Sequence, residues 1–172
     1  VDENEISVFA ELTMAQLSAG GDIDIKDFLA RVRSLGKLKL SVIISNYLRY
    51  FRLREYINRY TKKDMGIIVG IRNIRDIFDE KFYDGMEGGI LAAFGKLFTG
   101  NTKLYVYPEK HAETGEIVTG HNVAIKDTLK GLYDHLLANE FLTSLEGYDE
   151  SVFGIDTREV LSALKKGDGP WR

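Results

Sequence analysis

The chain has 172 residues, of which 44% are hydrophobic and 28% are charged, as in an ordinary globular domain. Its formal net charge of -3 argues against general nucleic-acid binding, which usually requires a clearly basic surface. Zero cysteines exclude disulfides and thiolate metal sites, and no apolar run approaches the roughly 20 residues that span a bilayer. We therefore expect a cytoplasmic protein that does not enter a membrane, with one α/β domain over residues 1–172. Because the chain begins at Val1 without a Met, we also expect a fragment of a larger protein.

The hydrophobic pattern predicts helices and strands in alternation. Apolar residues at helical spacing predict helices over about 4–19, 22–35, 47–63, 72–82, 86–98, 124–139 and 157–166. A nearly continuous apolar run predicts a strand buried on both faces at 38–45. Further strands are predicted at 65–69 and 102–107, with an exposed turn or hairpin over 108–122. The segments between the predicted strands are long enough to hold a helix, and such connections imply parallel βαβ units. The expected fold is α/β, three-layer and Rossmann-like, with a mostly parallel sheet and flanking helices.

The end of the first predicted strand is the first candidate site. Ser45 and Asn46 stand where the apolar run stops, and open α/β sheets bind ligands past the carboxyl ends of their strands. A hydroxyl, an amide and the free N–H groups of a following helix suit an anionic ligand. The alternative is that Ser45 or Asn46 only caps that helix. Arg49 and Arg54, expected to flank the start of the helix, are candidates for supplying positive charge.

The run from Tyr47 to Lys63 is basic and aromatic, with six basic residues and one acidic residue. Such a composition can hold phosphates and stack bases. In helical projection, however, one face that we expect to be core collects Tyr50, Leu53, Tyr56, Ile57 and Tyr60. A second arc holds Arg52, Glu55 and Arg59, where the glutamate can pair with both arginines. We expect a solvated amphipathic helix, with a surface for phosphate or an acidic partner as the alternative.

The end of the second predicted strand repeats the arrangement of the first. Gly70, Arg72 and Asn73 follow an apolar run, so two adjacent strand ends are expected to present polar and basic groups together. Lys96 is a further source of charge. Glu87-Gly88-Gly89 precedes a helix, where paired glycines allow either close approach of a ligand or close helix packing. Neither dinucleotide-binding nor P-loop spacing is present.

Other chemistries have weaker sequence support. His111, His121 and His135 lack metal-ligand spacing, so no metal site is predicted. Asp22-Ile-Asp24 followed by the Ser45 strand resembles the aspartate and Ser/Thr motifs of haloacid-dehalogenase-type phosphatases, although Ala19-Gly20-Gly21 replaces the hydrophobic strand of that family. No catalytic residue and no cofactor are predicted.

The segment Gly154-Ile-Asp-Thr-Arg-Glu-Val-Leu-Ser-Ala-Leu-Lys-Lys-Gly167 resembles the closing motif of nicotinamide/nicotinate-nucleotide adenylyltransferases, Ile-Ser-Ser-Thr-x-Ile-Arg followed by a helix and Gly. Segments including Ile43-Ile-Ser-Asn46 and Lys103-Leu-Tyr-Val-Tyr-Pro108 are also similar to bacterial proteins that carry this label. In the alignment, Leu161 takes the position of the motif's arginine, and Val118-Thr-Gly-His121 lacks the first histidine of H-x-G-H. The resemblance implies a nucleotidyltransferase-related, nucleotide-binding fold.

Two functional hypotheses follow from these features. The first is a domain that binds a nucleotide or another anionic, phosphorylated metabolite at the strand carboxyl ends. The second is a non-catalytic interaction or oligomerisation domain, in which the basic helix and the Tyr105/Tyr107 strand end face another domain or a second copy of the chain.

Overall fold

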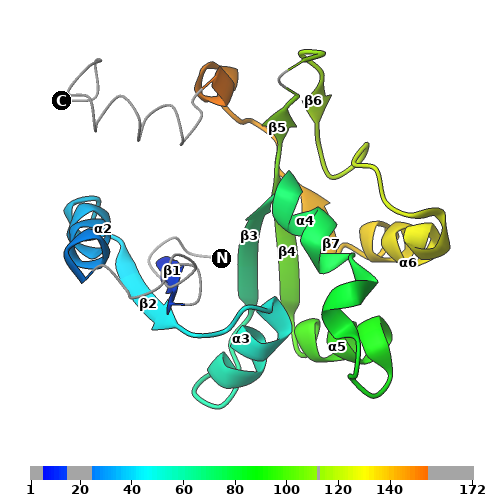
Figure 1. Cartoon of the computed structure of the whole chain (residues 1–172), viewed down its shortest axis with the longest axis horizontal. Helices are drawn as coiled ribbons and strands as arrows, with labels where there is room; N and C mark the ends of the chain where they lie inside the picture. The colour runs from blue at the N-terminus through cyan, green and yellow to red at the C-terminus, as the bar shows by residue number, and fades with distance from the viewer. Residues whose placement is uncertain (1–5, 15–24, 112, 155–172) are drawn as a thin grey trace. The chain divides into compact units, whose positions relative to one another are not determined.

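The computed structural model describes residues 6–14, 25–111 and 113–154 (Figure 1). The chain divides into two compact units, Val1–Lys62 and Lys63–Arg172. Each unit contains a parallel sheet, with strand order β1-β2 in the first and β3-β4-β7 in the second. The α/β class and the mostly parallel strands are therefore confirmed. No helix among the described residues combines the length and the apolar character that crossing a membrane requires.

The first unit pairs two short strands side by side. Its described elements are β1 (Phe9–Thr13), α2 (Ile25–Lys37), β2 (Ser41–Ser45) and α3 (Tyr50–Ile57). β1 and β2 run parallel, in a register that sets Thr13 opposite Ser45 at their carboxyl ends. The predicted helix 22–35 is confirmed in α2, and the strand predicted at 38–45 is confirmed in β2.

The helix expected over residues 4–19 is wrong where the structure describes it, because Phe9–Thr13 is a strand. Apolar spacing over so few residues fits a helix and a strand almost equally well. All five residues of β1 pair with β2, and this non-local pairing decides between the two. Gly20, Gly21, Asp22 and Asp24 lie outside the described residues, as do the predicted helix 157–166 and the family motif beyond Gly154.

The second unit contains most of the predicted alternation. In chain order it is formed by β3 (Met65–Gly70), α4 (Ile71–Ile77), η2 (Glu80–Tyr83), α5 (Gly89–Leu97), β4 (Thr102–Tyr107), β5 (Glu109–Lys110), β6 (Ile117–Val118), α6 (Asp127–Ala138), β7 (Leu142–Ser144) and η3 (Glu150–Gly154). The central strand β4 is parallel to both neighbours. β5 and β6 form the expected hairpin. β7, only three residues long, was not predicted.

One face of the β3-β4-β7 sheet forms the core of the second unit. Ile67, Leu104 and Val106 are buried on this face, and α4 packs against β3 and β4 while α6 packs against β7. On the opposite face, Ile68 is 69% exposed and Tyr105 is half-buried. This alternation is typical of a sheet packed on one side. The burial on both faces expected for the strand at 38–45 is wrong, because Ile44 of β2 is 53% exposed.

Aromatic rings join the helices of the second unit. The ring of Phe78 lies 5.0 Å from that of Phe94 in α5 and 5.0 Å from that of Tyr133 in α6, both with edge-to-face geometry. Such pairs are stabilising beyond the area that they bury. They fix α6, and with it Tyr133, relative to the helices that follow β3.

Candidate functional site

Ser45 ends β2 as predicted, but its hydroxyl is engaged within the first unit. It donates to Glu11 Oε1 at 2.5 Å and accepts from the backbone N–H of Tyr47 at 3.2 Å. A hydroxyl can donate only one hydrogen bond, and the Ser45 hydroxyl donates its bond to the carboxylate of Glu11. Glu11 also brings negative charge to this strand end, which disfavours an anionic ligand beside Ser45. Asn46, the next residue, is exposed.

The helix-cap alternative for Ser45 and Asn46 is wrong. α3 begins later than expected, at Tyr50, and its N-cap is Arg49, with no side-chain hydrogen bond at the cap. The Arg49 side chain instead donates to the backbone carbonyl of Leu48 at 3.1 Å. Ser45 and Asn46 are too far from the first turn to cap it.

Arg54 does not flank the start of the helix. α3 has eight residues, and Arg54 lies in its last turn, where it is 1% exposed. The prediction assumed a helix that starts at the end of the strand, which would have placed this residue early in the helix. A guanidinium this buried is not available at an open rim.

The aromatic face of α3 also differs from its helical projection. Phe51 and Leu53 are buried, whereas Tyr56 is 38% exposed and Tyr60 is 74% exposed. Because the helix ends at Ile57, Tyr60 lies beyond it, and the projected stripe of tyrosines does not reach the core.

The charged arc of α3 is partly as predicted. The guanidinium of Arg52 forms an ion pair with the carboxylate of Glu55 at 4.0 Å. Both side chains are substantially exposed, so the pair contributes little to stability.

The junction of β3 and α4 places three predicted residues together in the second unit. Gly70 ends β3 beside Tyr107 of β4 and is the N-cap of α4, without a side-chain cap bond. A Cβ on Gly70 would lie 3.6 Å from Asn73 Oδ1, so the amide of Asn73 lies close to the strand end. Arg72, which lies between Gly70 and Asn73 in the sequence, has an exposed side chain. The group offers a guanidinium and an amide at the carboxyl end of a parallel strand.

The other predicted residues belong to other elements than this group. β2 and β3 belong to different sheets, so the expectation that their ends are adjacent in one sheet is wrong. Lys96 is in the last turn of α5, which leads into the first residue of β4. It therefore belongs to the amino-terminal edge of the sheet, opposite Gly70. Gly88 is the N-cap of α5 and Gly89 is its first residue, and both have a positive φ, +77 and +53, which favours glycine.

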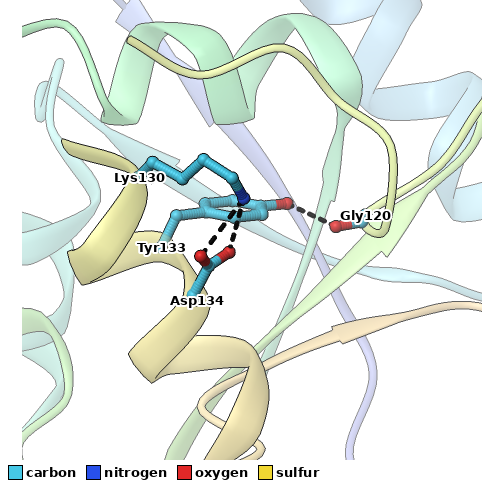
Figure 2. Close-up of polar contacts among 4 residues, drawn as sticks. All are labelled: Gly120, Lys130, Tyr133 and Asp134. Carbon is cyan, nitrogen blue, oxygen red and sulfur yellow. Dashed lines mark hydrogen bonds and ion pairs between the residues drawn. The ribbon is translucent and has the colours of Figure 1, made fainter. Parts of the chain in front are cut away.

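A loop anchored by the buried Gly120 at the same carboxyl edge was not predicted as part of a site. Gly120 lies between the hairpin and α6, where the hydroxyl of Tyr133 donates to its carbonyl at 2.6 Å (Figure 2). Its N–H donates to Ser144 Oγ at 3.2 Å, and Ser144 is the last residue of β7. Lys130 and Asp134 form a 2.9 Å ion pair one helical turn apart beside Tyr133. The loop is thus fixed to a strand end and to a helix.

Gly120 also packs too closely for a side chain. A Cβ at this position would lie 3.2 Å from Ser144 Cβ and 3.4 Å from Val106 Cβ. Val106 and Ser144 are paired across β4 and β7 near their carboxyl ends. The backbone of the loop therefore lies directly over the ends of two parallel strands.

Burial raises the pKa of Tyr133, with the charge of Asp134 as a smaller cause. A phenol is protonated throughout the neutral range in any case, and the raised pKa of Tyr133 extends the pH range in which it donates to Gly120. The loop has further internal bonds, since Asn122 Oδ1 accepts from the N–H of Thr119 at 2.6 Å and the N–H of His121 donates to Thr119 Oγ1 at 3.1 Å. His121 is exposed on this fixed turn.

The signal in the sequence was Val118-Thr-Gly-His121, a glycine between polar residues after the third strand. Its partner Ser144 belongs to the short strand that was missed, so spacing alone could not join them. No three His, Cys, Asp or Glu side chains gather as a metal site in the part of the chain that the structure describes. Comparisons with protein-family models, curated proteins and solved structures found no match to this chain.

Proposed function

We propose that the carboxyl edge of the β3-β4-β7 sheet binds a small phosphorylated metabolite, with nucleotides as the first class to test. The observation that carries the proposal is that the fixed turn at Gly120 and the β3–α4 junction both lie at the ends of adjacent parallel strands. Ligands of open α/β sheets bind at this edge.

The chemistry of the edge supports an anionic ligand. Arg72 is exposed and can form two parallel hydrogen bonds to a phosphate, while the amide of Asn73 can donate or accept. Because the backbone of the turn around His121 is already fixed, it would lose little conformational freedom on binding a ligand. Buried polar contacts keep this turn in place, which is the usual requirement for a precise binding site.

The finer part of the proposal is a Rossmann-like, nucleotidyltransferase-related domain. The resemblance to nicotinamide/nicotinate-nucleotide adenylyltransferases supports beginning with nucleotides. The departures at Leu161 and at the missing H-x-G-H histidine argue for binding rather than adenylyl transfer. The alternative of an interaction or oligomerisation domain stays a prediction, which light scattering of the chain in solution tests.

A thermal-shift screen tests the proposal directly. The full chain is heated with inorganic phosphate, sugar phosphates and nucleoside mono-, di- and triphosphates. We expect at least one compound to raise the melting temperature, because a ligand that binds only the folded state stabilises it. In Arg72→Ala, the affinity for that compound should fall by about tenfold or more, since charge-assisted hydrogen bonds contribute about 1.5–3 kcal/mol.

The matched control is Arg75→Ala, which removes another exposed arginine from the same helix. It carries the same change of net charge and should leave the affinity within about twofold of the original. The proposal is wrong if no phosphorylated compound shifts the melting temperature. It is also wrong if Arg72→Ala and Arg75→Ala weaken binding equally.

A further inference from the structure

Three tyrosines of the first unit form a continuous exposed row. The ring of Tyr56 lies 5.5 Å from that of Tyr47 and 5.1 Å from that of Tyr60, measured between centroids. Their exposed fractions are 36% for Tyr47, 38% for Tyr56 and 74% for Tyr60. We call these residues the tyrosine row. Single exposed tyrosines are ordinary, but three joined by ring contacts through Tyr56 form an aromatic patch of the kind that marks interaction sites.

The row holds its rings together. Both pairs are tilted, by 41° and 59°, and the distances are those of favourable aromatic contacts. Interaction with the Tyr60 hydroxyl raises the pKa of Tyr56, in keeping with the ring contact between the two residues. A ligand that stacks on this surface therefore meets side chains that are already ordered.

Positive charge surrounds the row. Arg52 lies one helical turn before Tyr56, and the charge of Arg59 acts on the Tyr56 hydroxyl. Both arginines are exposed, and so is Lys62. Of the six basic residues between 47 and 63, Arg54 is 1% exposed and Lys63 belongs to the second unit. The exposed positive charge near the row is therefore that of Arg52, Arg59 and Lys62, with Arg52 also ion-paired to Glu55.

We propose that the tyrosine row binds a short single-stranded nucleic acid, with bases stacked on the rings and phosphates near Arg52 and Arg59. Exposed aromatic rings beside basic groups are how single strands are bound without sequence preference. An acidic peptide would be held by the arginines alone and would leave the row without a role. The bases of a duplex are already stacked and paired with one another, so only a single strand can offer its bases to the rings, and the proposal is limited to single strands.

This surface belongs to the first unit and does not use the carboxyl edge of the β3-β4-β7 sheet. The two proposals therefore fail separately. Arg72→Ala, which should weaken binding of a phosphorylated metabolite, should leave binding of a single strand unchanged.

Fluorescence anisotropy of a labelled oligothymidylate of about eight nucleotides, a typical site size, measures the binding by the full chain. We expect Tyr60→Leu to weaken the affinity by about fivefold to a hundredfold, because one stacked base is worth about 1–3 kcal/mol. Tyr60→Phe keeps the ring and should retain most of the affinity. Arg59→Glu should weaken it and reduce its dependence on salt.

The matched control is Tyr148→Leu, which makes the same change at a half-buried tyrosine of the second unit. Far-UV circular dichroism verifies that each variant is folded, and Tyr60→Phe separates loss of the ring from loss of structure. The proposal is overturned if the original chain does not bind the oligonucleotide, or if Tyr60→Leu binds as well as Tyr148→Leu. Equal competition by oligoglutamate would also overturn it, because stacking would then contribute nothing.

Discussion

Tyr133→Phe removes the hydroxyl that holds the Gly120 loop and leaves the aromatic ring. The ring of Tyr133 is 3% exposed and packs edge-to-face on Phe78, so the phenylalanine should keep this packing. What is lost is the 2.6 Å bond to the Gly120 carbonyl, which is itself buried. The substitution therefore reports on one hydrogen bond and on the acceptor left behind.

The expected loss of stability follows from that geometry. A hydrogen bond contributes about 0.5–1.5 kcal/mol net, and a buried group left without its partner costs about 1–3 kcal/mol. We expect Tyr133→Phe to lower the free energy of unfolding by about 1–3 kcal/mol at neutral pH, measured by urea titration and circular dichroism. Tyr105→Phe, at a half-buried tyrosine of β4, is the control and should change stability by less than about 0.5 kcal/mol.

The pH dependence of this difference in stability is a second test of the same hydrogen bond. Burial raises the folded-state pKa of Tyr133 above the unfolded value of about 10. The stabilisation from the protonated phenol is therefore complete below about pH 10 and is lost as the pH rises further. The stability gap between the original chain and Tyr133→Phe should narrow in that range. A gap near zero at neutral pH, or one that widens with rising pH, would show that the protonated Tyr133 hydroxyl does not stabilise the fold.

Two further predictions use paired substitutions. Gly120→Ala should lower the free energy of unfolding by about 1–3 kcal/mol, because its Cβ would press on the strand ends. Gly131→Ala in α6, where a Cβ meets nothing within 4 Å, should raise it by about 0.5–1 kcal/mol. Thermal melts measure both changes, and equal effects would contradict the close packing at Gly120. Leu104→Ala should cost about 2–5 kcal/mol in urea titrations because Leu104 is 0% exposed, whereas Ile68→Ala on the opposite face should cost less than about 1 kcal/mol; similar losses would show that both faces of the sheet are packed.

The fold was predictable where the sequence pattern is long and local. β4 has the expected bounds, and α2 and α6 begin and end within a few residues of their predictions. β1 was mistaken for a helix because only its pairing with β2 separates the two interpretations. β7 was missed because a three-residue strand carries too little pattern, and its identity depends on β4 beside it.

The candidate site was predictable only in part. Gly70 and Asn73 lie at a strand end as expected, because the apolar run of β3 and the residues that follow it are enough to locate that end. Lys96 does not lie at this edge, because α5 runs toward the start of β4 and carries Lys96 in its last turn. The contacts of Gly120 with Tyr133 and Ser144 join residues 13 and 24 positions apart, and spacing does not reveal such contacts.

The measurement that tests the central claim most directly is an amide-resolved NMR titration of the full chain with a nucleoside monophosphate and, separately, with inorganic phosphate. We expect the backbone signals of Gly70, Asn73 and Gly120 to shift together and to saturate with one dissociation constant. Signals that do not move, or shifts confined to the tyrosine row, would contradict a phosphate-binding site at the carboxyl edge of the sheet.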